Sequence, residues 1–448
     1  MLMPTSTIDN DCETVRPQSP RIAVVGAGAA GAVCAARLFA DGHDVTLFER
    51  DTRAGGHVHT HTVCDRPGHS LAIDTGFIVY NPECYPNFTR LIDELGVSTQ
   101  ATDMSLAVEL SSGRAWSSRR PFAEPQLYFD LDHWRLLAGL PHLHRELARL
   151  SSVDAPPSDE TVAEFATRRG LARAVIDRYL LPMGAAVWSC EPGEFAQFPA
   201  QFLAQFMANH GMLQLLRRPR WRSIVGGSAT YMDRLLAPLR RHNVLRLAEP
   251  VQAIRRYADR VEVDTARARA VRFDQVVLAC HTDQALELLV DANDVERAAL
   301  AAVPYGDSEV VLHTDARAMP RSRRAWAAWN VLARPTVNSA VAVTYWMNPL
   351  QQLDRVGATR DYFVTLGSSD RVASNSVIAR LRYTHPIFRA SRTLAHQSLH
   401  RISGVERRTH FAGAAWGWGF HEDAVRSGLR VARALGAHVP VLEVAHAP

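Results

Sequence analysis

The sequence predicts an α/β fold, and three features near the N-terminus lead to this prediction. A short apolar run is followed directly by GAGAAG, residues 26–31, which has GxGxxG spacing. A helix-compatible stretch comes next, and then a second apolar run that ends at Glu49. A strand, a glycine turn, a helix and a second strand with an acid about 20 residues on form the pattern of a Rossmann-like dinucleotide-binding unit.

Each part of this unit has a physical role. Gly26 permits a tight turn, Gly28 lets the backbone approach a pyrophosphate, and Gly31 lets the helix pack against the strand. The phosphates would lie at the helix N-terminus, where free N–H groups and the helix dipole favour an anion. The carboxylate of Glu49 can bind ribose hydroxyls. The predicted cofactor contacts of this unit are Gly26, Gly28, Ala29, Ala30, Gly31 and Glu49.

The residues that follow indicate which dinucleotide is bound. Glu49, Arg53 and the pair Gly55-Gly56 fit the pattern ExxxRxGG. The chain thereby resembles the flavin-containing amine oxidase superfamily, which includes monoamine oxidases and phytoene desaturases. The resemblance implies FAD, which should be non-covalent because no cysteine lies in a recognisable flavin-attachment motif. Many members carry arginine directly after the two glycines, where this chain has His57. The expected FAD contacts in this stretch are Arg50, Arg53, Gly55, Gly56 and His57.

Longer segments extend the resemblance over residues 21–436. The stretches AIDTGFIVYNPECYPNFTRLIDELGV, GGHVHTHT and GFHEDAVRSG are similar to a bacterial group of FAD/NAD-binding, amine-oxidase-like proteins. This group also resembles the N-terminal oxidase-like part of plant cyclopropane fatty acid synthases. The resemblance implies that Asp74, Thr75 and Gly76 lie near the isoalloxazine and that Val251 lies against the adenine.

The same resemblance implies two interleaved domains, an FAD-binding domain and an α+β substrate-binding domain. Residues 1–20 are polar and are predicted to be a disordered tail. The remaining assignments place residues 21–94, 221–288 and 400–448 in the FAD-binding domain, and residues 95–220 and 289–399 in the substrate-binding domain.

The stretch GAAWGWGFHEDAVRSG, residues 413–428, can be interpreted as an acid/base cluster or as cofactor architecture. In the superfamily, the last FAD-binding element is a strand, a glycine loop and a helix that points at the flavin pyrimidine. We expect the helix to begin at Asp423, with free N–H groups at Ala424, and a carboxylate of Glu422 or Asp423 to cap it. The expected FAD contacts are Gly413, Gly419, Phe420, Glu422, Asp423 and Ala424.

His421 is the catalytic candidate within this stretch. An imidazole has an ordinary pKa near 6.5, which suits proton transfer at neutral pH. The two acids beside it should turn away from the flavin ring, because a carboxylate near the ring would oppose reduction.

A second group of histidines, His57, His59 and His61, alternates with other residues. On a strand, all three imidazoles would face one side, and imidazole is a ligand for zinc, copper or iron. No carboxylate or cysteine nearby completes a metal site, so we favour polar lining of the flavin pocket and predict no metal. His281, which follows an apolar run, is expected to lie in a loop.

Aromatic residues also require interpretation. Four phenylalanines between residues 195 and 206 have helical spacing, which is typical of a core helix. The alternative is a lipid-facing helix, with an arginine collar at residues 217–220 for phosphate headgroups. The candidates for a substrate-pocket wall are Trp188, Tyr345, Trp346, Trp416 and Trp418.

Composition excludes several classes of function. The net charge of +4 is too small to suggest nucleic acid binding, and the six cysteines form no CxxC pair, which favours reduced thiols in a cytoplasmic protein. All basic charge is arginine, because the chain contains no lysine. Chemistry that needs an amine side chain, such as the lysine-held water of many amine oxidases, is therefore excluded.

Four functions remain open from the sequence. The first is an FAD-dependent oxidoreductase that transfers a hydride from a hydrophobic substrate, such as a fatty acyl chain, to flavin N5. The others are an amine oxidase, a flavin-dependent double-bond isomerase, and a non-catalytic FAD-binding partner of a lipid methyltransferase. The first hypothesis also allows a peripheral contact with a membrane.

Overall fold

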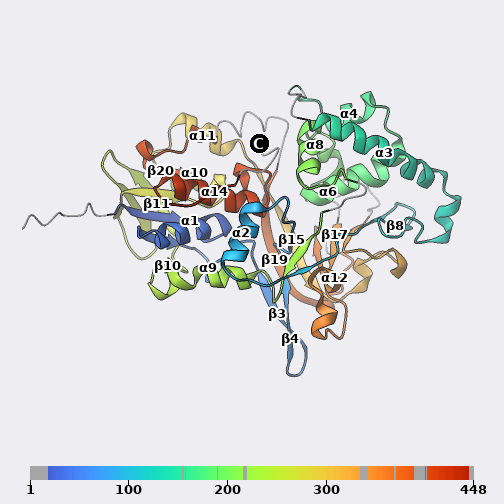
Figure 1. Cartoon of the computed structure of the whole chain (residues 1–448), viewed down its shortest axis with the longest axis horizontal. Helices are drawn as coiled ribbons and strands as arrows, with labels where there is room; N and C mark the ends of the chain where they lie inside the picture. The colour runs from blue at the N-terminus through green and yellow to red at the C-terminus, as the bar shows by residue number, and fades with distance from the viewer. Residues whose placement is uncertain are drawn as a thin grey trace, which may run out of the picture.

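The chain is organised around two large sheets (Figure 1). The computed structural model describes residues 19–152, 156, 158–188, 190–214, 219–332, 342–367, 370–387, 399 and 401–442, without the side chain of residue 405. The first sheet has five strands and the second has seven. The helical segment 131–209 lies above the second sheet in the view of Figure 1, and its helix α8 (Ala200–Asn209) contacts the loop before α14 (His421–Ala434).

The five-stranded sheet is entirely parallel, and the chain returns to it from distant segments. Its central strand carries the apolar run after Arg21, which is buried on both faces as parallel strands usually are. Because all the strands run the same way, their carboxyl ends meet at one edge. In order, the strands are β10 (Leu245–Arg246), β2 (Asp44–Phe48), β1 (Arg21–Val25), β14 (Gln275–Leu278) and β20 (Thr409–Phe411).

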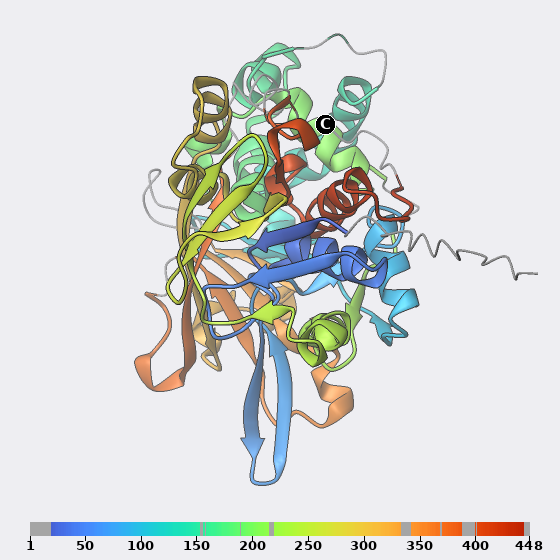
Figure 2. The same cartoon turned by 90° about the vertical axis from the view of Figure 1, so that its left-hand side faces the viewer.

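Four helices share one hydrophobic core with one face of this sheet. Gly428 lets two of them approach closely, since a Cβ at this position would lie 2.3 Å from the carbonyl oxygen of Ala30. The other face packs against a small antiparallel sheet, which Figure 2 shows beside the parallel strands. The helices are α1 (Ala29–Ala40), α2 (Pro86–Glu94), α9 (Ala229–Arg241) and α14 (His421–Ala434), and the small sheet is β11 (Val251–Arg256), β12 (Val261–Thr265) and β13 (Val271–Phe273).

The seven-stranded sheet combines strands from before and after the helical segment. Its pairs are antiparallel except β16 with β7. Two helices, α10 (Thr282–Leu288) and α11 (Asp294–Ala301), connect the first sheet to it. In order, its strands are β19 (Val377–Pro386), β15 (Tyr305–His313), β18 (Phe363–Leu366), β17 (Ala342–Trp346), β16 (Trp329–Leu332), β7 (Leu106–Glu109) and β8 (Ala115–Ser117).

The helical segment has its own aromatic core. Phe195, Phe198, Phe202 and Phe206 are at most 8% exposed and surround Trp188 with ring centroids 4.7–5.6 Å away. The core interpretation is confirmed, and the lipid-facing alternative is wrong for these side chains. The expected single helix is wrong, because Phe195 ends α7, Phe198 lies in the turn before Pro199, and Phe202 and Phe206 lie on α8. Arg217 and Arg218 of the predicted collar lie outside the described residues. The helices are α3 (Leu131–Leu150), α4 (Val162–Arg168), α5 (Arg173–Val175), the π-turn η2 (Ile176–Leu180), α6 (Leu181–Trp188), α7 (Pro192–Phe195) and α8 (Ala200–Asn209).

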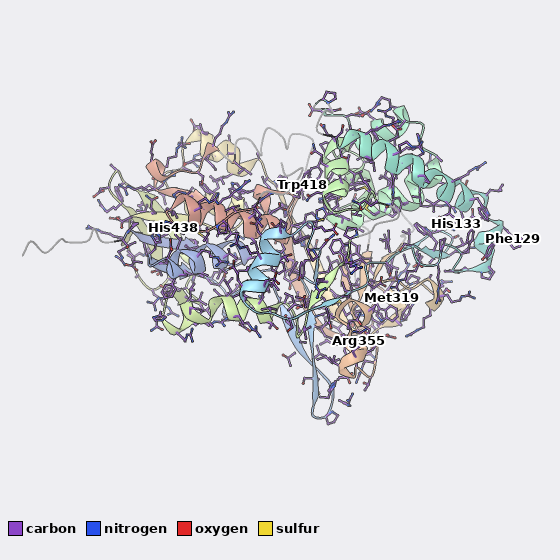
Figure 3. All side chains as sticks on the ribbon, in the orientation of Figure 1. Phe129, His133, Met319, Arg355, Trp418 and His438 are labelled. Carbon is purple, nitrogen blue, oxygen red and sulfur yellow. The ribbon has the colours of Figure 1, made fainter. Side chains whose placement is uncertain are left out.

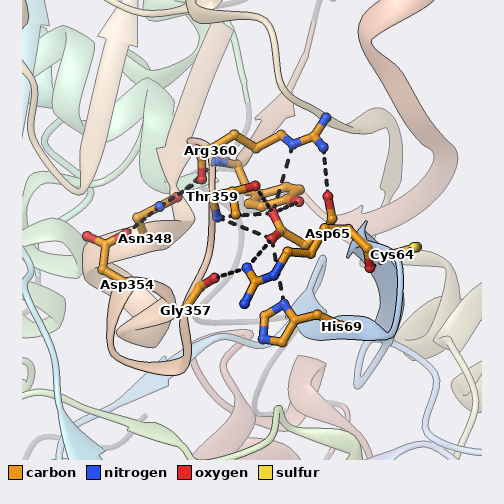
Figure 4. A network of polar contacts seen from close by, with 10 residues as sticks. Cys64, Asp65, His69, Asn348, Asp354, Gly357, Thr359 and Arg360 are labelled. Atoms are coloured by element: carbon orange, nitrogen blue, oxygen red, sulfur yellow. Dashed lines mark hydrogen bonds and ion pairs between the residues drawn. The ribbon is translucent and has the colours of Figure 1, made fainter.

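A hairpin and a small sheet complete the fold. The hairpin is β3 (Thr60–Arg66) with β4 (His69–Asp74), and the small sheet is β5 (Val79–Tyr80), β9 (Arg222–Ile224) and β6 (Thr99–Ala101). The buried carboxylate of Asp65 fastens the hairpin to the segment after α12 (Met347–Gln351) (Figure 4). It accepts hydrogen bonds from the Thr359 backbone N–H at 3.1 Å and the Tyr362 hydroxyl at 2.8 Å.

The architecture agrees with the predicted α/β class, with a Rossmann-like sheet and an interleaved α+β part. The domain boundaries drawn from the sequence remain a prediction. Within the part of the chain that the structure describes, no helix is both long enough and apolar enough to cross a bilayer.

Candidate functional site

The glycine loop between β1 and α1 lies at the carboxyl edge of the parallel sheet. Gly26 has φ +100°, and its N–H donates to the Phe48 carbonyl at 2.8 Å. A Cβ at Gly31 would lie 1.9 Å from the Gly26 carbonyl oxygen, so this position must be glycine for α1 to pack. A Cβ at Gly28 would meet no atom within 4 Å. Gly28 therefore faces open space, as a residue that admits a ligand should.

The N-terminus of α1 opens toward the same space. Its N-cap is Gly28, so no side chain accepts hydrogen bonds from the first N–H groups. Ala29 and Ala30, the first helical residues, are small and buried. Uncapped N–H groups together with the helix dipole favour an anion at this point.

Glu49 is buried at the end of β2 and holds the loop in place. One carboxylate oxygen accepts a hydrogen bond from the Ala27 N–H at 2.8 Å, and the other accepts one from the Asp51 N–H at 3.0 Å. Its predicted contact with a ribose remains a prediction. Val251 begins β11 and is only partly buried.

The second glycine pair packs against the first loop. The Gly55 N–H donates to the Ala27 carbonyl at 2.8 Å, and Gly55 forms a parallel bridge with Gly28. The guanidinium of Arg53 donates to the carbonyls of Gly56 at 2.7 Å and Val58 at 3.1 Å. Arg53 therefore braces the turn that carries the glycines.

Arg50 behaves differently from Arg53. Its side chain is 65% exposed and lies 3.9 Å from Asp51. The structure therefore separates two arginines that the sequence had grouped as cofactor contacts.

The segment after β4 runs beside the turn that follows Gly56. A Cβ at Gly76 would lie 2.0 Å from the His57 carbonyl oxygen, so only glycine allows the two backbones to pass. The Thr75 N–H donates to the His59 carbonyl at 3.0 Å. This close crossing places Thr75 and Gly76 next to the histidine segment.

Asp74 is fully buried and organises its surroundings. Its carboxylate accepts hydrogen bonds from the Ser228 N–H and hydroxyl at 2.9 and 2.8 Å and from the Gln351 amide at 2.9 Å. Burial raises the pKa of Asp74 to about 6, and hydrogen bonds from Thr60 and Ser228 partly oppose this rise. Asp74 thus joins β4, the loop before α9, and α12.

Three histidines from distant segments meet at the edge of the parallel sheet. The ring centroid of His57 lies 6.3 Å from that of His281 and 5.1 Å from that of His385. Buried nitrogens of all three rings have no partner among the described residues. Desolvation lowers the pKa of His57 to about 3 and that of His385 to about 4, so these imidazoles are neutral.

Two tyrosines frame this histidine cluster. The Tyr305 ring stacks on His281 with centroids 4.5 Å apart. The Tyr383 hydroxyl lies 3.0 Å from the Thr75 hydroxyl and 3.1 Å from His59 Nδ1. The sequence analysis did not single out His385, Tyr305 or Tyr383.

The predicted single face of three imidazoles is wrong. The strand begins at Thr60, and the rings of His59 and His61 lie 4.1 Å apart, whereas the His57 ring turns toward His281 and His385. Among the described residues, no group of three or more histidine, cysteine or acidic side chains could hold a metal ion.

The closing glycine loop lies beside the end of β20. The Gly413 N–H donates to the Ser427 hydroxyl at 2.9 Å, and this hydroxyl donates back to the Gly413 carbonyl. The carboxylate of Asp423 accepts hydrogen bonds from the backbone N–H groups of Trp418 at 2.9 Å and Phe420 at 3.0 Å. Gly419 has φ +90°, which permits the turn between them.

The helix after this loop begins earlier than the sequence suggested. It starts at His421, two residues before Asp423, and the Ala424 N–H already donates to the Phe420 carbonyl. The N–H of Ala424 is therefore not free for a ligand, and the available N–H groups belong to the residues before it.

His421 is enclosed by aromatic rings. Its Nε2 lies 2.7 Å from the Tyr231 hydroxyl, and its ring stacks on Phe77 with centroids 3.8 Å apart. Desolvation lowers the pKa of His421 to about 3. At neutral pH this imidazole is neutral, so it cannot serve as a proton donor in imidazolium form.

The comparisons with known proteins show the family of the chain. A family model described as flavin containing amine oxidoreductase matches residues 29–436, which is most of the chain. The chain belongs to this family. It is an FAD-dependent oxidoreductase with the fold of amine oxidases and related FAD enzymes.

One curated relative and two solved structures illustrate the similarity. A 39-residue stretch is 49% identical to 4,4'-diapophytoene desaturase of Staphylococcus aureus (strain bovine RF122 / ET3-1), and it covers 9% of this chain and 8% of that protein. The fatty acid isomerase from P. acnes matches with TM-score 0.65 at 17% identity, over 93% of this chain and 99% of that chain. Cyclohexylamine oxidase from Brevibacterium oxydans IH-35A matches with TM-score 0.65 at 16% identity, over 93% and 98%.

These identities to solved structures are too low to show more than the fold. No plant cyclopropane fatty acid synthase is among these relatives, so that resemblance stays a prediction.

The residues at the sheet edge fit FAD. The open side of Gly28 and the uncapped start of α1 suit the diphosphate, and Arg53 supplies positive charge nearby. The unpartnered nitrogens of His57 and His385 offer hydrogen-bonding groups to the same ligand. The glycine loop, with the turn that Arg53 holds beside it, therefore remains our predicted site for the diphosphate.

The predicted pocket aromatics separate into three groups. Trp188 and Trp418 belong to the aromatic core of the helical segment, and Phe202 contacts both of them. Trp416 stacks on Phe411 in the core between the five-stranded sheet and the small antiparallel sheet.

The other two pocket candidates are neighbours on β17. Tyr345 packs edge-on against Trp329 with ring centroids 5.0 Å apart. Trp346 faces the opposite side of β17 and donates to Asp361 at 2.9 Å. Tyr345 and Trp346 therefore cannot line one wall together.

Proposed function

We propose that this flavoenzyme oxidises an apolar substrate, with a fatty acyl chain as the first candidate. The proposal rests on the finding that the carboxylates beside the predicted flavin site are already hydrogen-bonded to protein groups. Asp74, Glu422 and Asp423 each accept several hydrogen bonds from protein groups. None of these three is therefore available as a counter-ion for a substrate ammonium.

Apolar side chains of the helical segment 131–209 pack against the loop that leads into α14. Phe202 lies 4.8 Å from Trp418, and Phe206 stacks on Phe420 with centroids 5.0 Å apart. Both contacts join α8 to the loop that leads into α14. These side chains are buried against one another, so the surroundings of this loop are apolar and favour an apolar substrate over a charged one.

FAD supplies the chemistry, since a bound flavin can accept a hydride at N5 from a substrate carbon. The protein must hold the flavin, exclude water from it, and donate or accept protons during the reaction. The N-terminus of α14 favours negative charge near it, which supports the reduced state of a flavin placed there. His421 is neutral and hydrogen-bonded to Tyr231, so we assign it to positioning.

The amine oxidase alternative has less support. The chain contains no lysine that could hold a water near the flavin. Its structural similarity to cyclohexylamine oxidase shows a shared fold at 16% identity.

The isomerase alternative has one specific observation in its favour. The similarity to the fatty acid isomerase from P. acnes covers 93% of this chain. A redox-neutral shift of a double bond in an acyl chain would be favoured by the same apolar surroundings.

Anaerobic mixing of the FAD-loaded protein with candidate substrates separates these functions. Bleaching of the flavin absorbance by a fatty acyl lipid, without bleaching by amines, supports the proposal. Bleaching by amines alone would overturn it. Altered acyl product without net bleaching would indicate isomerisation, and silence with both, together with binding to a lipid methyltransferase, would indicate a non-catalytic partner.

A further inference from the structure

The start of the helical segment carries an unusual concentration of exposed apolar side chains. Tyr128 is 55% exposed, Phe129 89%, Leu131 72% and Trp134 48%. The other exposed large apolar residues of the described chain are scattered over distant segments. Exposed apolar residues are normal when single, but four within seven residues indicate an interaction site.

The local structure holds these four side chains outward. The carboxylate of Asp130 caps α3 by accepting hydrogen bonds from the N–H groups of Asp132 at 3.0 Å and His133 at 3.1 Å. The indole N–H of Trp134 donates to the Tyr128 carbonyl at 2.9 Å, which fastens η1 (Pro125–Phe129) to the first turn of α3. These hydrogen bonds fix the conformation of residues 128–134, which we name the apolar tip.

Its position agrees with exposure to a surrounding medium. Figure 3 shows Phe129 at the outer edge of the molecule, with His133 behind it. Phe122 stacks on Tyr128 with ring centroids 4.4 Å apart and supports the tip from inside. His133 is fully buried, so the side chains of this turn are divided into an exposed apolar side and a buried side.

The charges around the apolar tip do not oppose a lipid surface. Asp130 pairs with Arg178 at 2.9 Å, and Asp132 pairs with Arg135 at 2.9 Å. The acids at the tip are thus neutralised, so they do not repel a phosphate headgroup.

The size of the tip favours a membrane over a protein partner. Its four side chains expose on the order of 500 Å² together, given about 150–250 Å² for a whole large side chain. A stable protein interface needs roughly 800 Å² from each partner. A small convex knob with phenylalanine and leucine between tyrosine and tryptophan instead suits the interfacial region of a bilayer.

We propose that the apolar tip inserts into the interfacial layer of a phospholipid bilayer and docks the enzyme there. Phe129 and Leu131 enter the acyl boundary, and Tyr128 and Trp134 lie at the headgroup level. The apolar tip is a different part of the molecule from the phenylalanines of α8, which are buried. The inference is independent of which substrate the enzyme oxidises.

The test compares two double variants of the FAD-loaded protein in sedimentation with vesicles. F129S/L131S removes the apolar tip, and V290S/V295S removes two valines that are 54% and 56% exposed on another part of the surface. Vesicles contain phosphatidylcholine with phosphatidylglycerol. We expect F129S/L131S to lower the vesicle-bound fraction at least about tenfold, and V290S/V295S to leave it unchanged.

Three results would overturn the proposal. They are equal binding by F129S/L131S and the parent protein, an equal loss in both double variants, or no vesicle binding by the parent protein. A dimer of the parent that F129S/L131S converts to a monomer, without vesicle binding, would show instead that a second copy covers the tip. Unchanged circular dichroism and flavin content of F129S/L131S would show that the variant is folded.

Discussion

The carboxylate of Glu422 accepts two hydrogen bonds from Asn87, one from the side-chain amide at 2.6 Å and one from the backbone N–H at 3.1 Å. Its second oxygen accepts a hydrogen bond from the Phe88 N–H at 2.9 Å. An acid at the start of α14 thereby caps the start of α2, 335 residues earlier in the chain. Burial raises the pKa of Glu422 to about 7, although these hydrogen bonds oppose the rise.

Removal of this carboxylate should destabilise the protein. Glu422→Ala leaves buried donors of Asn87 and Phe88 without an acceptor, so the free energy of unfolding should fall by about 2–4 kcal/mol. Glu83→Ala, which removes an exposed acid just before the same helix, should change it by less than about 0.5 kcal/mol. Urea unfolding of both variants measures the difference, and equal effects would contradict the capping role.

Two glycines of one motif should respond differently to a side chain. Gly28→Val should fold but bind no FAD, because its Cβ meets no protein atom within 4 Å and would project into the space for the diphosphate. Gly31→Val should fail to fold, since its Cβ would lie 1.9 Å from a carbonyl oxygen. Circular dichroism together with visible flavin absorbance measures both outcomes. A Gly28→Val protein that retains full flavin would refute the phosphate assignment.

Two nearby arginines form a second matched pair. Arg53→Met should weaken FAD binding by about tenfold or more, because the guanidinium braces the carbonyls of Gly56 and Val58. Arg50→Met should have little effect, since Arg50 is 65% exposed. Fluorescence titration of the apoprotein with FAD measures both affinities. Equal losses of FAD affinity in both variants would show that positive charge matters more than the hydrogen bonds of Arg53 to Gly56 and Val58.

The buried histidines should make the protein sensitive to acid. His421 has a folded pKa of about 3 against 6.5 for an ordinary histidine, so the unfolded chain binds more protons between these values. Stability present above pH 6.5 is therefore lost as the pH falls, by up to about 1.4 kcal/mol per pH unit for this residue. His421→Gln can keep a hydrogen bond to Tyr231 and should reduce the slope by that amount. Urea unfolding of the holoprotein at pH 7, 6 and 5 tests this, and identical slopes would contradict it.

The phenylalanines of α8 should behave as core residues. Phe206 is 2% exposed, and Phe206→Ala should lower the free energy of unfolding by about 3–5 kcal/mol. Phe129→Ala, at the apolar tip, should change it by less than about 0.5 kcal/mol. Thermal or urea unfolding measures both. A small effect at Phe206 would reopen the lipid-facing interpretation.

Local patterns were sufficient for much of the fold. The GxGxxG loop requires particular backbone angles and close approaches, so its glycines identify the turn and the helix without reference to distant residues. The aromatic spacing likewise predicted buried side chains, although Pro199 divides them between α7, a turn and α8. The start of α14 was misplaced by two residues, because Asp423 caps the preceding loop amides and so lets His421 begin the helix.

The sequence by itself thus determined the dinucleotide unit and the α/β class, because these depend on short-range backbone constraints, and its resemblance to a flavoprotein family implied FAD. Only the tertiary structure decided the surroundings of the side chains that carry chemistry. His57, His281 and His385 meet although more than 300 residues separate the first from the last, and Glu422 turns toward Asn87. Such contacts depend on burial and on pairing between distant segments, which no local pattern encodes.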